Sequence, residues 1–413
     1  MAGGAPPLSV YVHIPFCESV CYYCACNKII TKHHSRGTEY LGWLAHEIDL
    51  HRAELGSASA LTQLHLGGGT PTFLSDGELS ELMRLLRSAF KWDADAELAI
   101  EVDPRTANQE RLRHLRELGF NRISFGVQDF DPDVQAAVHR IQPLASVSEL
   151  MTQARALGFH SINVDLIYGL PRQTPVSFNR TIAQVAALRP DRIALYAYAH
   201  LPERFKPQRR IVTADLPSAE QRVNMLGDAI AGFIAHGYVY VGMDHFALPT
   251  DALAVAKRQG RLHRNFQGYS TQPECDLIGL GVSAIGRIGA TYSQNAKTLA
   301  EYQDALAQGQ FAVVRGLALT RDELLRRAVI MALMCQGRVD FESIEVSHLI
   351  RFSDAFAAEL TQLRELQALD LVTLSEQDVA VTALGWYFVR AIAMVFDKPL
   401  QSAQMRERFS RVI

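Results

Sequence analysis

The sequence predicts an α/β fold in which six strand–helix units form a partial barrel or a curved parallel sheet, followed by a mainly helical domain. The alternation of two sequence patterns leads to the first part of this prediction. Short runs rich in valine, isoleucine and leucine alternate with amphipathic helical patterns over the first part of the chain. Alternation at this spacing is typical of parallel strands joined by right-handed helical crossovers. A flat, doubly wound sheet is the alternative for the same pattern.

Six segments carry the strand pattern. In chain order they are LSVYVHI (8–14), LTQLHL (61–66), AELAIEV (96–102), RISFGV (122–127), SINVDLI (161–167) and RIALYAY (192–198). A helical pattern follows each of them. The helix predicted over 76–90 has apolar residues at helical spacing, namely Leu79, Leu82, Met83, Leu86 and Phe90. Glycines in ELGF (117–120) and ALGF (156–159) stand where helices commonly end.

The pattern changes near residue 309, which divides the chain into a domain over 1–308 and a C-terminal domain over 309–413. Helical patterns dominate the second part, and DLVTLSEQDVAVTALG predicts a hairpin before a last helix. This order resembles a winged-helix module, and such modules often bind DNA. However, the segment 309–413 has 12 Lys and Arg against 13 Asp and Glu, which argues against nucleic acid. We therefore expect a packing or lid domain.

Composition narrows the class of protein. The chain has 413 residues, of which 48% are hydrophobic and 21% charged, as in ordinary globular proteins. No apolar run approaches the roughly 20 residues of a membrane helix, and the opening MAGGAPPLSV lacks the features of a signal peptide. Six cysteines are too few for a disulfide-stapled secreted scaffold. We expect a cytoplasmic protein without nucleic-acid or membrane partners.

Four of the six cysteines lie together in CESVCYYCAC (17–26). Cys17, Cys21 and Cys24 have the spacing C-x3-C-x2-C, and Cys26 follows after one more residue. Thiolates at this density are soft ligands that favour zinc or iron–sulfur over hard cations. Structural zinc usually takes its ligands from two separated knuckles, whereas one tight loop can bind three corners of a 4Fe–4S cluster and leave the fourth iron open. A redox pair and incidental thiols are the remaining alternatives.

Polar and glycine-rich segments follow several of the predicted strands. HLGGGTPT (65–72) comes after the second strand, and consecutive glycines allow the backbone to approach a ligand closely. Parallel βα folds bind ligands beyond the carboxyl ends of their strands. Those ends carry Glu101, Gln128, Asp165 and the run YAYAH (196–200). These groups suit the amine, hydroxyls and carboxylate of an amino-acid nucleotide, although each alone could be a turn or a helix cap.

Several motifs together carry a family resemblance. They are YVHIPFCESVCYYCACNK, GGGTPT, IEVDP, FGVQDF, DLIYGLP, HRNFQGYST and the terminal RFSRVI. They resemble motifs of the radical S-adenosylmethionine (SAM) enzymes, and within these the oxygen-independent coproporphyrinogen III oxidases, or coproporphyrinogen dehydrogenases. The resemblance implies a partial (βα)6 TIM-like barrel of the radical SAM type with a mainly helical C-terminal domain. It also implies a 4Fe–4S cluster and two SAM molecules.

The resemblance implies roles for individual residues. Cys17, Cys21 and Cys24 would hold the cluster, whose open iron binds the first SAM. Tyr11, Gly68, Glu101 and Ile285 match positions around the first SAM. The positions around the second SAM are matched by Tyr23, Gly69, Thr70, Gln128, Arg140, Asp165 and Ala199. Tyr23 departs from the family pattern, in which phenylalanine is common, but keeps an aromatic wall.

The implied reaction turns two propionate side chains of coproporphyrinogen III into vinyl groups, giving protoporphyrinogen IX in haem biosynthesis. A deoxyadenosyl radical made from SAM removes a hydrogen, and carbon dioxide and one electron then leave. Cys26 is not needed as a ligand, so we expect a catalytic role for it. The loop ERFKPQRR (203–210) offers Arg204, Arg209 and Arg210 for the substrate carboxylates, although basic surface loops are usually only solvated. We expect a monomer that takes electrons from a partner such as flavodoxin or ferredoxin.

Two alternative functions differ in class. A haem chaperone related to these enzymes usually has an aromatic residue in place of Cys26 and a HNxxYW-like stretch. Here Cys26 is present, and Ser270 follows Tyr269 in HRNFQGYST. Both features favour the oxidase. An anaerobic haem-degrading radical SAM enzyme is the second alternative, closer in chemistry.

Overall fold

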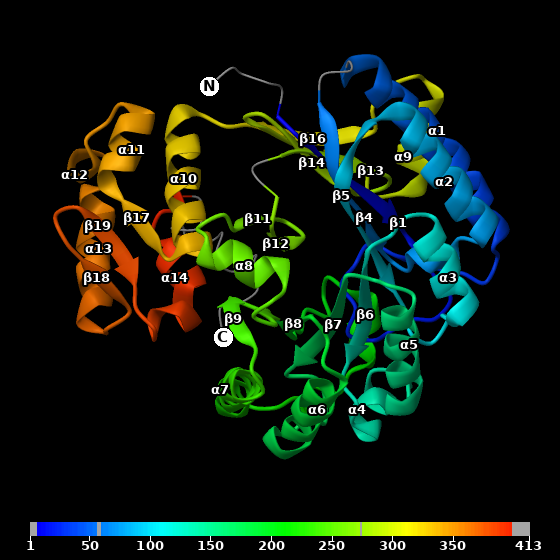
Figure 1. Ribbon diagram of the computed structural model, residues 1–413, viewed down its shortest axis with the longest axis horizontal. Helices are drawn as coiled ribbons and strands as arrows, with labels where there is room; N and C mark the ends of the chain where they lie inside the picture. The colour runs from blue at the N-terminus through cyan, green and yellow to red at the C-terminus, as the bar shows by residue number, and fades with distance from the viewer. Residues whose placement is uncertain (1–5, 56–58, 273–274, 399–413) are drawn as a thin grey trace. The chain divides into compact units, whose positions relative to one another are not determined.

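The computed structural model of the chain describes residues 6–55, 59–272 and 275–398. Figure 1 shows the course of the chain. The chain divides into two compact units, each built from two segments. Unit 1 comprises Met1–His236 and Glu274–Ala318, and unit 2 comprises Gly237–Pro273 and Leu319–Ile413. The sequence pattern predicted a domain boundary after residue 308, whereas unit 1 ends at Ala318. Residues 237–273, which the sequence analysis assigned to the first domain, belong to unit 2.

Six parallel strands form the centre of the sheet in unit 1. They are β1 (Leu8–Ile14), β4 (Ala60–Gly68), β5 (Lys91–Val102), β6 (Arg122–Gln128), β7 (Ser161–Tyr168) and β8 (Arg192–Ala197). They lie side by side in chain order, and every neighbouring pair is parallel. All six predicted strands are therefore confirmed, with β5 beginning at Lys91 rather than at residue 96.

Helices connect these strands and follow the last one. They are α1 (Ser35–Leu55), α2 (Asp76–Ala89), α3 (Gln109–Glu117), α4 (Pro132–Ala137), α5 (Leu144–Ala156), α6 (Pro175–Leu188) and α7 (Ala219–Ala235). In Figure 1, α1, α2 and α3 lie along one side of the sheet. A capping box between Ser75 and Glu78 starts α2 where the sequence predicted it. Its apolar face is buried, as expected for a helix that covers a sheet.

The sheet continues beyond β1 with strands that the sequence pattern did not predict. β13 (Asp276–Leu280) pairs with β1 in parallel, with Gly279 opposite Tyr11. It is followed by the antiparallel strands β14 (Ile285–Ile288), β15 (Thr291–Asn295) and β16 (Val313–Ala318). Helix α9 (Leu299–Ala307) connects the last two. Their sequences are short and partly polar, so pairing with neighbours rather than local pattern places them in the sheet.

Unit 2 is mainly helical, as predicted for the C-terminal part of the chain. Its helices are α8 (Ala252–Arg258), α10 (Arg321–Gln336), α11 (Phe341–His348), α12 (Phe352–Ala355), α13 (Ala357–Ala368) and α14 (Val389–Met394). The predicted hairpin is β18 (Val372–Leu374) with β19 (Asp378–Val381), and β17 (Arg338–Asp340) pairs with β19. The remaining strands are β9 (Val239–Gly242), β10 (His245–Ala247), β11 (His263–Asn265) and β12 (Gly268–Ser270).

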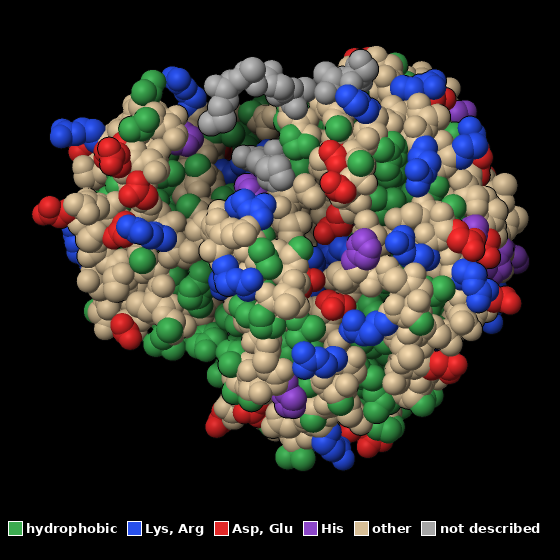
Figure 2. Space-filling model, in the orientation of Figure 1, with side chains coloured by type: hydrophobic (Ala, Val, Ile, Leu, Met, Phe, Trp, Pro, Cys, Tyr) green, Lys and Arg blue, Asp and Glu red, His purple; other side chains and the backbone are tan. Residues whose placement is uncertain are grey.

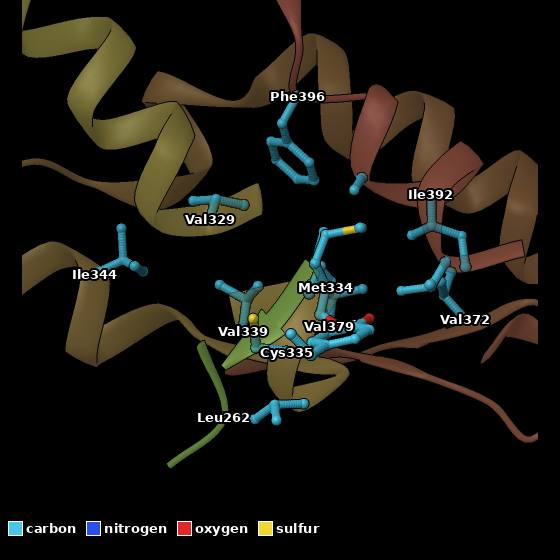
Figure 3. Packing of buried hydrophobic residues seen from close by; sticks show 14 of the residues in the cluster. Leu262, Val329, Met334, Cys335, Val339, Ile344, Val372, Val379, Ile392 and Phe396 are labelled. Carbon is cyan, nitrogen blue, oxygen red and sulfur yellow. Dashed lines mark hydrogen bonds between the residues drawn. The ribbon is translucent and has the colours of Figure 1, made fainter. Parts of the chain in front are cut away.

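Both segments of unit 2 contribute to one hydrophobic core. Figure 3 shows Val329 and Met334 of α10 near Phe396 and Ile392, with Leu262 from the earlier segment below them. All five of these residues are almost completely buried. Because a shared buried core gives a domain its cohesion, residues 237–273 belong with the C-terminal segment in packing terms.

Charge is distributed without a dominant sign. On the face shown in Figure 2, Lys and Arg side chains are interspersed with Asp and Glu side chains over each unit. Among the described helices, none combines the length and the apolar character needed to cross a membrane.

Candidate functional site

The cysteine loop is closed at its base by two short strands. β2 (Phe16–Cys17) pairs in parallel with β3 (Ile29–Ile30), which sets Cys17 opposite Ile30. The Thr31 amide donates to the Cys17 carbonyl oxygen at 2.9 Å. All four thiols of the loop are free, and Cys21 is the buried one. The loop therefore follows directly on β1, at the carboxyl end of the central strands.

Hydrogen-bond donors from three other segments contact the thiols. Thr70 Oγ1, just beyond β4, donates to Cys17 Sγ at 3.4 Å. Arg105 Nη2, beyond β5, and Arg140 Nη1, between α4 and α5, each lie 3.5 Å from Cys21 Sγ. Donors and positive charges near sulfur stabilise thiolate, the form that binds metal. This surrounding is the one expected for ligating thiols.

The acidities of the loop thiols differ. Burial raises the pKa of Cys17 to about 11. A hydrogen bond with Cys26 lowers the pKa of Cys24 to about 6, and the same bond raises the pKa of Cys26. Cys24 therefore loses its proton before Cys17 and Cys26 do. Lys28, whose Nζ donates to the Cys24 carbonyl oxygen at 2.8 Å, also lowers the pKa of Cys24.

The spacing of the thiols in the sequence favours a cluster over a single ion. In the parts of the chain that the structure describes, no three side chains of His, Cys, Asp or Glu converge as the ligands of one metal ion would. Three thiolates of a 4Fe–4S cluster each bind a different iron, so they need not point to one centre. The spacing of Cys17, Cys21 and Cys24 along one loop therefore remains the argument for a cluster over zinc.

A buried ion-pair network stands behind Cys21. Arg105 Nη2 lies 2.6 Å and Arg140 Nη1 3.3 Å from Asp103 Oδ2. Arg140 Nη2 also donates to the Gly126 carbonyl oxygen at 2.5 Å. Burial alone would raise the pKa of Asp103, but the two guanidinium groups hold it below its ordinary value. Sequence analysis selected Arg140 but missed Asp103 and Arg105, although both follow Glu101 directly beyond β5.

The residues expected around the first SAM come together at the ends of β1, β4 and β5. Glu101 Oε2 accepts from the Gly68 amide at 3.2 Å, and Glu101 Oε1 lies 3.2 Å from His65 Nε2. Burial opposes ionisation of Glu101, but these bonds lower its pKa below the ordinary value. The Tyr11 ring stacks on His65 with centroids 5.9 Å apart. Glu101 is thus held as a carboxylate facing the glycine loop.

Glycine is required at position 68. Its φ of +112° lies in a region that L side chains rarely adopt, and a Cβ there would come within 2.6 Å of the His13 ring. His13 is itself fixed, because its Nδ1 lies 3.0 Å from Tyr11 Oη. Ile285 belongs to the same region: its backbone packs against Gly279, the register partner of Tyr11. All four residues expected around the first SAM are therefore near neighbours.

A second group of expected residues surrounds Gly126 in β6. A Cβ at Gly126 would come within 2.9 Å of Gln128 Nε2 and 3.0 Å of Arg140 Nη2. Asp165 is the β7 register partner of Gly126 and accepts from Ser124 Oγ at 2.9 Å. The strand is irregular here, with a φ of +69° at Gln128. Gln128, Arg140 and Asp165 therefore gather at one point of the strand ends.

Gln208 joins the other expected residues, and sequence analysis missed it. Its Nε2 donates to the Tyr23 carbonyl oxygen at 2.9 Å and to the Ala199 carbonyl oxygen at 3.1 Å. Its Oε1 accepts from the Leu201 amide at 2.6 Å, and the side chain is 1% exposed. Gln208 therefore connects the segment after β8 to the cysteine loop through hydrogen bonds. Gly69 lies at the foot of that loop, where its amide donates to the Ile14 carbonyl oxygen at 2.8 Å.

The basic loop lies partly beside the cysteine loop. The Arg210 guanidinium stands over the Tyr22 ring, 5.2 Å from its centroid, and Nη1 donates to Tyr22 Oη at 3.3 Å. Arg209 Nε donates to the Pro202 carbonyl oxygen at 2.9 Å. Arg204, Arg209 and Arg210 are exposed. Arg210 is thus the member of this loop that directly contacts the cysteine loop.

Known proteins resemble the chain over nearly its whole length. Residues 11–185 match the radical SAM superfamily, and residues 319–388 match the HemN C-terminal domain. The oxygen-independent coproporphyrinogen III oxidase of Pseudomonas aeruginosa is 51% identical over 98% of this chain and 89% of its own length. That of Escherichia coli is 50% identical with the same coverage.

A solved structure agrees with these relatives. Coproporphyrinogen III oxidase (HemN) from Escherichia coli, described as a radical SAM enzyme, matches with a TM-score of 0.93 and 50% identity. The match covers 95% of this chain and 90% of that one. The chain belongs to the oxygen-independent coproporphyrinogen III oxidase family of radical SAM enzymes.

Proposed function

We propose that this chain catalyses the oxygen-independent oxidative decarboxylation of coproporphyrinogen III. Two propionate side chains become vinyl groups, giving protoporphyrinogen IX for haem biosynthesis. The observation that carries the proposal is the set of three free thiols, Cys17, Cys21 and Cys24, beside polar strand ends in a chain whose close relatives are named for this reaction. Cys26 and Ser270 support the oxidase over the haem chaperone.

Cofactor binding follows from the arrangement of the side chains. Cys17, Cys21 and Cys24 would hold the 4Fe–4S cluster. When bound, cluster and SAM together supply one-electron cleavage of SAM and a radical that removes hydrogen from the substrate. The first SAM would lie near Tyr11, Gly68, Glu101 and Ile285. The second would lie near Tyr23, Gly69, Thr70, Gln128, Arg140, Asp165 and Ala199.

The protein's own groups would bind and orient these ligands. The ionised Glu101 offers carboxylate oxygens beside the open backbone of the glycine loop. Arg140 presents a planar guanidinium suited to a carboxylate, and Asp165 presents a carboxylate suited to ribose hydroxyls. Cys26 is exposed beside Cys24, where its thiol could pass a hydrogen atom or a proton to bound reactants.

Partners and substrate contacts complete the proposal. Arg204, Arg209 and Arg210 are candidates for binding the propionates because they are exposed cations on one loop. The reductant would be a small carrier protein such as flavodoxin or ferredoxin. We propose a monomer working in the cytoplasm, in keeping with the free cysteines of the described chain.

The test is an anaerobic incubation of the purified protein with coproporphyrinogen III, SAM and a reductant, followed by mass analysis of the tetrapyrrole. The proposal expects stepwise loss of carbon dioxide and two hydrogens from each of two propionates. A protein with a full cluster that yields no decarboxylated product would exclude the oxidase. A ring-opened product from haem would instead identify the haem-degrading alternative.

A further inference from the structure

The segment that follows the cysteine loop is the most uniformly basic part of this region. Residues 27–37 (NKIITKHHSRG) contain Lys28, Lys32 and Arg36, together with two histidines and no acidic residue. The chain as a whole has a formal net charge of −3. We call Lys28, Lys32, His33 and Arg36 the basic strip. Its charge is thus opposite in sign to that of the whole chain.

The basic strip is directly attached to Cys17. Ile30 is the register partner of Cys17, and the Thr31 amide donates to the Cys17 carbonyl oxygen at 2.9 Å. Lys32 follows immediately and is exposed. The Arg36 guanidinium stands over the ring of Phe16, 5.8 Å from its centroid. One hydrogen bond therefore separates the backbone of Cys17 from Thr31, the residue directly before the exposed Lys32 and His33.

These charges have few partners within the protein. Lys28 Nζ is held by the Cys24 carbonyl oxygen, and the neighbouring His34 lies 3.4 Å from Glu18. Among the described residues, neither Lys32 nor His33 takes part in an ion pair. Ile30 adds an apolar side chain with 43% of its surface exposed. A surface that combines free positive charge with an exposed apolar residue suits a partner protein of opposite charge.

We propose that the basic strip docks a small acidic one-electron carrier protein of the ferredoxin or flavodoxin class. This inference rests on the proposed function, because only a cluster at Cys17 gives the carrier an electron acceptor here. One electron leaves the reduced carrier and enters the cluster; no proton moves and no covalent bond forms between the proteins. Two hydrogen bonds connect this surface to cluster ligands: Lys28 Nζ donates to the Cys24 carbonyl oxygen at 2.8 Å, and the Thr31 amide, next to Lys32, donates to the Cys17 carbonyl oxygen at 2.9 Å.

Electrostatics sets the expected size of the effect. Opposite charges on two proteins raise the association rate constant, and this gain falls steeply with ionic strength. The Debye length is about 10 Å at 0.1 M salt, so the charges of the strip act on a carrier only at close approach. Reversing one lysine changes the local charge by two units. We expect association to slow by about 3- to 10-fold at low salt and hardly at all at high salt.

The experiment compares Lys32→Glu with Lys91→Glu in the reconstituted protein. Lys91 is a matched control because it is exposed and begins β5, at the opposite end of the strand from Glu101. Lys91→Glu changes the charge of the protein by the same two units as Lys32→Glu. An acidic ferredoxin is the probe. Its affinity is measured at low and high salt, and cluster reduction is followed by anaerobic stopped-flow absorbance with ferredoxin or with dithionite.

We expect Lys32→Glu to weaken ferredoxin binding and to slow reduction by ferredoxin several-fold at low salt. Its iron content and its reduction by dithionite should equal those of the wild type, and Lys91→Glu should match the wild type throughout. Equal effects of the two variants, or none from Lys32→Glu, would overturn the proposal. So would a raised KM for coproporphyrinogen III in dithionite-driven assays, which would make the strip a substrate surface.

Failure of the proposed function gives a different result. A wild-type protein that reconstitutes no cluster would contradict the proposed function itself. The salt-dependent affinity for ferredoxin does not require the cluster, so it would still decide whether the basic strip is a docking surface.

Discussion

The buried carboxyl group of Glu47 in α1 should make the free energy of unfolding depend measurably on pH. Its carboxylate is fully enclosed and accepts three hydrogen bonds, each of 2.6 Å, from the Gly281 amide, Asn295 Nδ2 and Tyr302 Oη. Burial nevertheless raises its pKa from 4.5 to about 7. The hydrogen bonds of this carboxyl group hold the turn that leads into β14 and Ile285. Protonation of Glu47 therefore affects the part of the chain where the first SAM is expected.

The magnitude follows from proton linkage. Because the folded-state pKa lies above the unfolded value, folding takes up a proton between these two pKa values. The resulting stabilisation is complete below about pH 4.5 and is lost as the pH rises through 7. A shift from 4.5 to about 7 corresponds to a total of about 3.4 kcal/mol. Between pH 5.5 and pH 8 the loss amounts to about 2 kcal/mol.

Glu47→Gln is the matching perturbation, since glutamine has the shape and neutrality of the protonated carboxyl group. The free energy of unfolding is measured by urea titration at pH 5.5 and pH 8 for both proteins, with Trp43 of α1 as a nearby fluorophore. Other groups titrate equally in both, so the difference between the two proteins isolates Glu47. We expect the wild type to lose about 2 kcal/mol more than the variant over this interval. Equal pH profiles, or a wild type that gains stability relative to the variant as pH rises, would refute the reasoning.

Three further predictions concern the site. Cys26→Ser should keep full iron content and an unchanged cluster spectrum but lose most vinyl formation; loss of iron would make Cys26 a ligand, and normal turnover would make it a packing residue. The double variant Arg209→Ala/Arg210→Ala should raise the KM for coproporphyrinogen III while substrate-free SAM cleavage continues, and an unchanged KM would return both residues to the solvated surface. Gln208→Leu should weaken SAM binding, measured by equilibrium dialysis, while the iron content is retained. The reason is that the hydrogen bonds to the Tyr23 and Ala199 carbonyl oxygens are lost. Unaltered SAM affinity would contradict a positioning role for Gln208.

The central strands were predictable because their pattern is local. Val10, Val12 and Ile14 in β1 are fully buried, and runs of such residues bounded by turns indicate strands in a sheet covered on both faces. β15 (Thr291–Asn295) is different. Its sequence TYSQN has no such pattern, and only its pairing with β14 and β16 makes it a strand. The grouping of residues 237–273 with unit 2 was hidden for the same reason, because it depends on contacts with residues far along the chain.

The candidate site divides in a similar way. Cys17, Cys21 and Cys24 are evident from spacing, and the strand-end rule finds Glu101 and Asp165. Gln208 was not predictable, because a glutamine in a basic loop has no pattern that distinguishes a buried bridge from a solvated side chain. Its role appears only when the Tyr23 and Ala199 carbonyl oxygens lie within reach of one amide.

The central claim is that three thiolates of one loop hold an open-site 4Fe–4S cluster. Its most direct test is the iron and acid-labile sulfide content after anaerobic reconstitution of Cys17→Ala, Cys21→Ala and Cys24→Ala, with Cys275→Ala as the control. Cys275 lies outside the loop, next to the start of β13. The account predicts full content in the wild type and the control and severe loss in each of the three loop variants. Full iron and sulfide in any one of those three would contradict it.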